Sequence, residues 1–243
     1  VDVSPPKWHL GHTTWFFEEF ILKDHLDNYQ VYDDRYAYVF NSYYESAGEK
    51  VVRSDRGNLS RPTVSEVYDF RKHVTEQLLD FIQNEDLSDH VKKVIELGCH
   101  HEKQHQELLL TDIKYILGNN PLHPVYKEDF EESRVQDFPQ EWIPVEEGVF
   151  WIGHNKRGEF CYENELGHHK IYLNRFQISN KLVTNKEVLE FMDDGGYEQV
   201  LLWHAEGWDW VNQNDIRSPF YWYEVNDSWQ QYTLSGLKPL NPN

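Results

Sequence analysis

Residues 89–117 read DHVKKVIELGCHHEKQHQELLLTDIKYIL and are followed by Gly118. Apolar residues recur here at spacings of three and four, which predicts one amphipathic helix, and a glycine is a common C-terminal stop. His101 and His105 are four residues apart, so they share one face of this helix. We expect the inward face to contain Val94, Leu97, His101, His105, Leu108 and Asp112.

Two further helices are predicted before this one. The first, with an aromatic face, runs from about Lys7 to Leu26, and the prolines at positions 5 and 6 suit its first turn. The second begins after Thr63, which forms a T-x-x-E capping box with Glu66. We therefore expect residues 1–120 to form an up-and-down bundle of about four helices.

The sequence changes in character after residue 120. Three prolines and an acidic run at 128–132 predict a linker over residues 121–141. Beyond it, WIPVEEGVFWIG (142–153) and HHKIYLNRFQIS (168–179) alternate like strands. A second capping box, Thr184 with Glu187, predicts a short helix that ends near Asp193. Residues 142–243 are thus expected to form an α+β domain.

The composition excludes some classes of function. The 243 residues include 42 acidic and 23 basic side chains, for a net charge of -19, which argues against binding to nucleic acid or anionic lipid. No apolar run approaches the roughly 20 residues of a membrane helix. Two cysteines and no signal peptide fit the reducing cytoplasm. We also expect that residues are missing at one or both ends.

The histidines predict a metal site. Residues at i and i+4 of a helix can bring both imidazoles to one ion, and burying them without partners would be costly. His12 is the polar position on the aromatic face of another helix of the same bundle. Three inward histidines from two helices favour one metal site over three separate hydrogen-bonded core histidines.

The string His101-Glu102-Lys103-Gln104-His105 also matches the H-E-x-x-H motif of zinc proteases. We do not favour that interpretation, because no third downstream ligand follows and the helical bundle is the wrong context. Three neutral imidazoles suit an iron that must accept an anionic thiolate together with O₂. They also suit zinc that activates water or a thiol, and the residues alone do not separate the two metals.

Two sets of motifs carry a resemblance to a known family. WHLGHTTWFFE (8–18) and HEKQHQELLLTDI (101–113) resemble the DinB-like domain of the ergothioneine-biosynthesis sulfoxide synthases, the EgtB family. GVFWIG (148–153), LVTNKEVLEF (182–191), DDGGY (193–197) and the L-W-x-x-E-G-W-x-W-V pattern (202–211) resemble its second domain. That domain has the formylglycine-generating-enzyme (sulfatase-modifying-factor, C-type-lectin-like) fold, and it normally continues for well over a hundred further residues.

The resemblance implies a non-haem iron enzyme. Iron(II) would be held by His12, His101 and His105, whereas His9 and His100 do not match the ligand positions. The implied reaction is the O₂-dependent coupling of cysteine, or of γ-glutamylcysteine, to C2 of the hercynine imidazole, which gives a sulfoxide. Gln104 matches a glutamine that hydrogen-bonds the imidazole substrate.

The resemblance also directs attention to a tyrosine and to arginines. In the subgroup that uses free cysteine, the proton donor lies in a segment like N-S-Y-Y-E, so Tyr43 and Tyr44 are the candidates here, and this favours cysteine. The substrate carboxylate calls for arginine. Of the arginines in VVRSDRGNLSRPT (51–63), Arg53 and Arg61 are the preferred candidates.

Other functions remain open on sequence grounds. A DinB-type zinc-dependent thiol transferase would use the same histidines without O₂, although simple members lack the second domain. Related synthases that make ovothiol or selenoneine-type products are also compatible with these residues. A non-catalytic metal-binding fragment is a third possibility.

Overall fold

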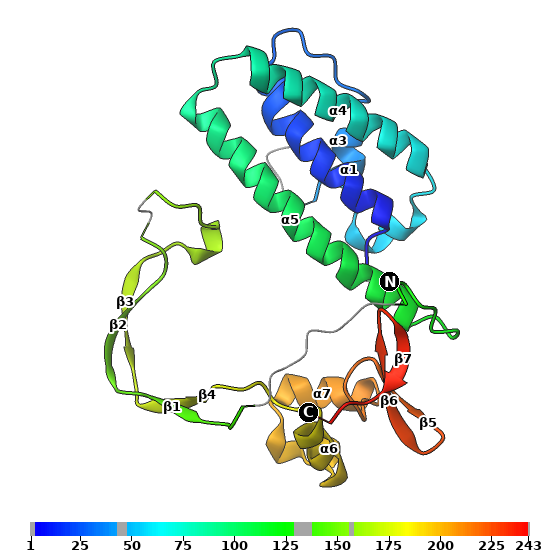
Figure 1. Ribbon diagram of the computed structural model, residues 1–243, viewed down its shortest axis with the longest axis vertical. Coiled ribbons are helices and arrows are strands. Elements are labelled where there is room, and N and C mark those ends of the chain that lie inside the picture. The colour runs from blue at the N-terminus through cyan, green and yellow to red at the C-terminus, as the bar shows by residue number, and fades with distance from the viewer. Residues whose placement is uncertain (1–2, 43–47, 129–137, 156–157, 243) are drawn as a thin grey trace. The chain divides into compact units, whose positions relative to one another are not determined.

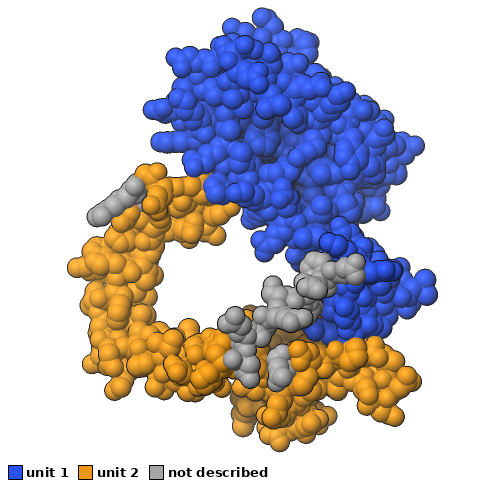
Figure 2. Space-filling view, in the orientation of Figure 1, with its two compact units in different colours: residues 1–130, 231–238 blue, residues 131–230, 239–243 orange. Residues whose placement is uncertain are grey.

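The computed structural model describes residues 3–42, 48–128, 138–155 and 158–242. The chain divides into two compact units (Figure 2), and each is described by itself. Unit 1 comprises Val1–Phe130 with Gln231–Lys238, and unit 2 comprises Glu131–Gln230 with Pro239–Asn243. A helical region is therefore followed by a region that contains strands, as the sequence predicts. None of the helices in the described ranges is both long and apolar enough to cross a membrane.

Unit 1 is built on three long helical segments. The first starts with α1 (Pro6–Phe17), continues through a π-helical turn (Glu18–Leu22) and ends with α2 (Lys23–His25), so the helix predicted from Lys7 to Leu26 is confirmed. The other two are α4 (Val64–Asn84) and α5 (Asp89–Gly118). Two shorter segments are α3 (Tyr36–Phe40) and a 3-10 helix (Arg53–Asn58).

Local signals set the helix boundaries. The Thr63 hydroxyl accepts a hydrogen bond from the Glu66 backbone N–H, and the Thr63 backbone N–H donates to the Glu66 carboxylate, so the predicted capping box is present. Ser88 caps α5, because its hydroxyl accepts a hydrogen bond from the Val91 N–H. Proline occupies the first turn of α1, where its missing N–H costs nothing.

The core of unit 1 lies around α1, which contacts both α4 and α5 (Figure 1). The side chains of Trp8, Trp15, Phe40 and Phe70 are at most 2% exposed. Contact between α1 and α5 is close at Gly98, where an added Cβ would lie only 2.5 Å from the Phe17 ring. The fold therefore holds the inward faces of α1 and α5 against each other.

The predicted inward face of α5 is correct only in part. His101, His105 and Asp112 are at most 9% exposed, but Leu97 and Leu108 are 38% and 41% exposed. These two leucines were wrongly assigned to the interior. The bundle of about four helices is represented, within the described residues, by three long helical segments and the five-residue α3.

Unit 2 begins with two antiparallel strand pairs, as the alternating segments predict. β1 (Trp142–Val145) pairs with β4 (Phe176–Ser179), and β2 (Gly148–Ile152) pairs with β3 (His169–Leu173). The helices α6 (Asn185–Asp193) and α7 (Ala205–Gln213) follow, and Thr184 and Glu187 form the predicted capping box of α6. The last strands of the chain are β5 (Trp222–Val225), β6 (Ser228–Thr233) and β7 (Gly236–Pro239), in sheet order β5-β6-β7, and residues 231–238 of this sheet are assigned to unit 1.

Part of the predicted linker is ordered within unit 1. The backbone N–H groups of Tyr126 and Lys127 both donate to the Leu234 carbonyl, at 2.9 and 3.0 Å. The Tyr232 hydroxyl donates to the Pro124 carbonyl at 2.7 Å. Residues 124–127 are thus attached to the segment around residues 232–234, which explains why 231–238 belongs to this unit.

Candidate metal centre

Three buried histidines converge at the contact between α1 and α5. His12 comes from α1, and His101 and His105 come from successive turns of α5. One ring nitrogen from each histidine lies within 4.8 Å of the other two. Their exposed fractions are 2%, 7% and 9%. The arrangement is compatible with a single bound metal ion and brings together all three ligands predicted from the sequence.

Neighbouring groups fix the orientation of His12. Its Nδ1 lies 2.6 Å from the Phe40 carbonyl oxygen, so Nε2 is the atom that can serve as a metal ligand. The imidazole is stacked between the rings of Trp8 and Trp15, at centroid distances of 4.6 and 5.6 Å. These aromatic residues of α1 pack against the imidazole, which is 2% exposed, and hold it in place.

The protonation states suit a metal ligand set. Burial is the main cause that lowers the pKa of each ring, to about 2 for His12, about 4 for His101 and about 3 for His105. The neighbouring imidazoles further lower the pKa values of His12 and His105. All three rings are therefore neutral at physiological pH, and a neutral imidazole is the form that binds a metal.

The histidines open into a cavity of about 210 Å³. Gln104 and Arg53, two of the residues predicted to bind substrate, line this cavity. Both are exposed, so they are accessible to a ligand. Arg61 is not among the described residues that line the cavity, and its guanidinium donates to the Ser60 carbonyl. Tyr43 and Tyr44 lie outside the described residues, directly after Ser42, which lines the cavity.

Arg56 was not among the arginines preferred from the sequence, yet it is only 6% exposed and lines the cavity. Its guanidinium carbon lies 3.5 Å from the centroid of the Trp8 ring, a cation–π contact. It donates hydrogen bonds of 3.0 Å to the hydroxyls of Ser4 and Ser42. Arg56 therefore supplies positive charge next to the histidines.

His9 was left out of the predicted ligand set and was given no other role, although it lies three residues before His12 and so shares its helix face. The ring is 5% exposed and lines the same cavity. Its two nitrogens contact His105 and Asp112. The helical spacing to His12 was the one signal in the sequence that pointed to this position.

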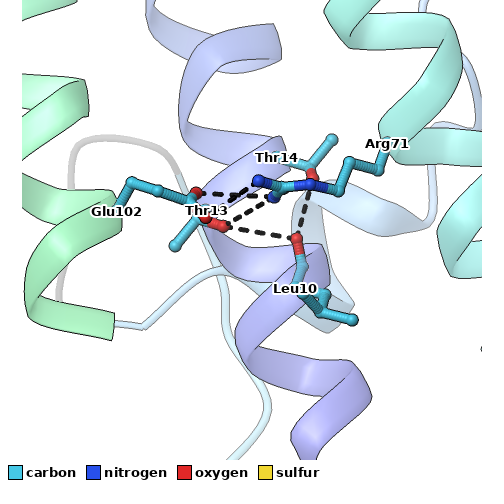
Figure 3. A network of polar contacts seen from close by, with 5 residues as sticks. All are labelled: Leu10, Thr13, Thr14, Arg71 and Glu102. Carbon is cyan, nitrogen blue, oxygen red and sulfur yellow. Dashed lines mark hydrogen bonds and ion pairs between the residues drawn. The ribbon is translucent and has the colours of Figure 1, made fainter. Parts of the chain in front are cut away.

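The glutamate of the H-E-x-x-H string is directed elsewhere (Figure 3). Glu102 accepts hydrogen bonds of 2.8 and 3.4 Å from Arg71 of α4. Arg71 also donates to the hydroxyls of Thr13 and Thr14 on α1, at 3.2 and 3.4 Å. Glu102 is not among the described cavity-lining residues, so it is not placed as the general base of a metalloprotease.

The fold and the site together define a helical domain with a candidate three-histidine metal centre, followed by a second domain of recognisable type. Residues 126–235 match the family model of the sulfatase-modifying factor enzyme 1-like domain. This match confirms the type of second domain expected from the sequence, and it begins within the predicted linker.

Three curated relatives bear the name hercynine oxygenase. The chain is 33% identical to the hercynine oxygenase of Mycolicibacterium smegmatis over 81 residues. This aligned segment covers 33% of this chain and 19% of the relative. It is 29% identical over 123 residues to the protein of Mycobacterium tuberculosis, and the alignment covers 50% of this chain and 28% of the relative. It is 28% identical over 128 residues to the protein of Mycolicibacterium thermoresistibile, and the alignment covers 50% of this chain and 27% of the relative. The chain therefore spans less than a third of these relatives, and the resemblance to the ergothioneine-biosynthesis sulfoxide synthases is confirmed.

Proposed function

We propose that this chain carries the iron site of a non-haem, O₂-dependent sulfoxide synthase that couples cysteine, or γ-glutamylcysteine, to C2 of hercynine. The observation that carries the proposal is the set of three buried, neutral histidines at a cavity that also contains Gln104 and two arginines. The relatives named hercynine oxygenase support the choice of substrate and oxidant.

The proposed reaction balances without a further reductant. The imidazole C–H and the thiol S–H bonds break, and a C–S bond forms. One oxygen atom of O₂ enters the sulfoxide, and the other leaves as water with the two hydrogens. Bound iron(II) would supply the redox chemistry with O₂ and an attraction for the substrate thiolate, because three neutral imidazoles do not offset its charge.

Side chains of the protein take the other roles. The Gln104 amide binds the hercynine imidazole, and the exposed Arg53 guanidinium pairs with a substrate carboxylate. Arg61 is not retained in this role, because it does not line the described part of the cavity. Tyr43 or Tyr44 donates the proton that the reduction of O₂ requires. Arg56 keeps the cavity positive, which favours an anionic substrate.

Product analysis tests the proposal. The protein is loaded with iron(II) under anaerobic conditions, mixed with hercynine and cysteine, and exposed to O₂. We expect mass spectrometry to detect the coupled sulfoxide and to detect less of it for the Tyr43→Phe or Tyr44→Phe variant. A parallel reaction with γ-glutamylcysteine identifies the preferred thiol. Tight zinc binding with no O₂ uptake and no coupled product would contradict the proposal and favour the thiol transferase.

A further inference from the structure

His9 is a fourth histidine in the cluster that the proposed function leaves without a role. It is 5% exposed and comes from α1. Its Nδ1 lies 3.0 Å from Nδ1 of His105, and its Nε2 lies 2.9 Å from Oδ2 of Asp112. The three side chains thus form a continuous hydrogen-bonded chain from a metal-ligand position to a buried carboxylate.

The chemistry of the three side chains decides which atom donates and which accepts in each of these hydrogen bonds. A carboxylate only accepts hydrogen bonds, so the Nε2 of His9 must donate to Asp112. A neutral His9 has a single N–H, and its Nδ1 then accepts the hydrogen of His105 Nδ1. His105 is thereby held in the tautomer whose Nε2 lone pair is available to a metal.

The Asp112 carboxylate, which ends this series of hydrogen bonds, is itself held in place by other contacts. Asp112 is 8% exposed and lies on α5, seven residues after His105. Its Oδ2 also accepts the backbone N–H of Ser4 at 3.0 Å. The Ser4 hydroxyl in turn accepts from Arg56. Asp112 is therefore a rigid acceptor attached to two other parts of unit 1.

We propose that His9 and Asp112 are positioning residues that orient His105 and set its tautomer for metal binding. Partners of this kind raise the basicity of a ligating imidazole and fix its ring, and their loss weakens metal binding about 10- to 100-fold. The proposal rests on the three-histidine metal site of the proposed function, but it does not depend on the substrate or on O₂.

The competing explanation is that His9 only fills the core. Two substitutions of nearly equal shape separate the explanations. His9→Asn keeps a carbonyl oxygen close to where Nδ1 of His9 accepts from His105, whereas His9→Leu removes the acceptor. His73→Leu is the matched control, because His73 is a partly buried histidine of α4 that contacts Tyr29 and Tyr32 and does not line the cavity.

The experiment measures cobalt(II) and iron(II) affinity at fixed pH by anaerobic competition with a chelator. It also records the visible spectrum of the cobalt(II) form and the unfolding midpoint of the metal-free protein. We expect His9→Leu to weaken binding at least about 10-fold and to change the cobalt spectrum. We expect His9→Asn to recover most of that loss, and His73→Leu to bind like the unaltered protein.

Equal metal affinity for His9→Leu and His9→Asn, or an unchanged cobalt spectrum in both, would overturn the proposal. Asp112→Asn provides the same test if His9→Leu does not fold, since it keeps the shape and removes the charge. Asp112→Asn should weaken metal binding several-fold, and an unchanged metal affinity in this variant would also overturn the proposal. Failure of the unaltered protein to bind metal would instead refute the proposed function, and this inference with it.

Discussion

At the scale of single residues, several ionisable side chains of unit 1 are buried. The three candidate ligands, His9, Asp112 and Glu18 are all less than about a tenth exposed. Most buried polar groups in proteins have hydrogen-bond partners, and such networks fix side-chain positions. The site therefore depends on neutral imidazoles whose orientations are set by their neighbours.

Glu18 provides a prediction at this scale. The side chain is 2% exposed and accepts hydrogen bonds from the Tyr29 hydroxyl at 2.7 Å and the Tyr32 N–H at 3.0 Å. Burial raises its pKa, so the folded state favours the neutral carboxyl and loses stability as the pH rises through the raised pKa. Glu18→Gln should therefore raise the unfolding midpoint at pH 7 by about 2–4 °C, the shift that about 1 kcal/mol produces in a chain of this size.

The neighbouring Glu19→Gln serves as the control for this measurement. Glu19 forms a surface pair with Lys23, which contributes little to stability. The gain from Glu18→Gln should also disappear as the pH falls through the raised pKa of Glu18, because the glutamate itself then becomes protonated. A lower midpoint for Glu18→Gln than for the unaltered protein at pH 7 would contradict the account.

At the scale of elements, the spacing of α1 and α5 decides whether the histidines meet. Gly98→Ala should destabilise the fold by about 1–3 kcal/mol, because its Cβ would lie 2.5 Å from the Phe17 ring. Denaturant unfolding measures this change. Gly207→Ala in α7 is the control, since its nearest neighbour would be 3.5 Å away and alanine is the better helix former. Equal stabilisation by both substitutions would show that the contact at Gly98 is not tight.

Arg71 provides a second prediction at the element scale. It connects α4 to Glu102 and to Thr13, the residues that directly follow His101 and His12 (Figure 3). Arg71→Gln should lower the free energy of unfolding by about 1–2 kcal/mol and weaken metal binding. Lys72→Gln, which removes an exposed pair with Glu76, should change neither property. Identical metal affinity in the two variants would exclude a role for Arg71 in spacing the ligands.

The sequence predicts most elements of the described fold, for identifiable reasons. Capping residues and helix periodicity locate α4 and α5, and alternation locates the four strands of the two antiparallel pairs. Periodicity identifies a helix face, but it does not specify how much of that face a neighbour covers. Leu97 and Leu108 were therefore assigned to the interior although both are substantially exposed.

The same distinction applies to the candidate site. His101 and His105 follow from helical spacing, and His12 from its place on an aromatic face. The contacts of His9 with His105 and Asp112 join residues 96 and 103 positions apart, and no local pattern encodes them. Likewise, Arg56 and Arg61 are equivalent as charges in one loop, and only tertiary packing buries the first of them.

For the whole molecule, the buried histidines predict sensitivity to acid. Their pKa values fall from about 6.5 to between about 2 and about 4 in the folded protein. Below pH 6.5 the unfolded chain binds protons that the folded chain does not, so stability decreases as the pH falls toward 4. Three such groups give a slope of up to roughly 4 kcal/mol per pH unit.

Urea unfolding of the metal-free protein between pH 7 and pH 4 measures this slope. His101→Gln should reduce the slope by about a third, because one of the three groups is removed. Metal-loaded protein should keep its stability to lower pH, since a bound metal competes with protons for the imidazoles. A free energy of unfolding that is constant from pH 7 to pH 5 would contradict the assignment of neutral buried histidines.

The most direct test of the central claim is the stoichiometry of iron(II) binding under anaerobic conditions. The account predicts one equivalent per chain for the unaltered protein and for His100→Gln, which changes the histidine next to His101 outside the cluster. His12→Gln, His101→Gln and His105→Gln should each lose this binding. Full binding by the His12→Gln variant would contradict the claim that α1 and α5 share one metal ion.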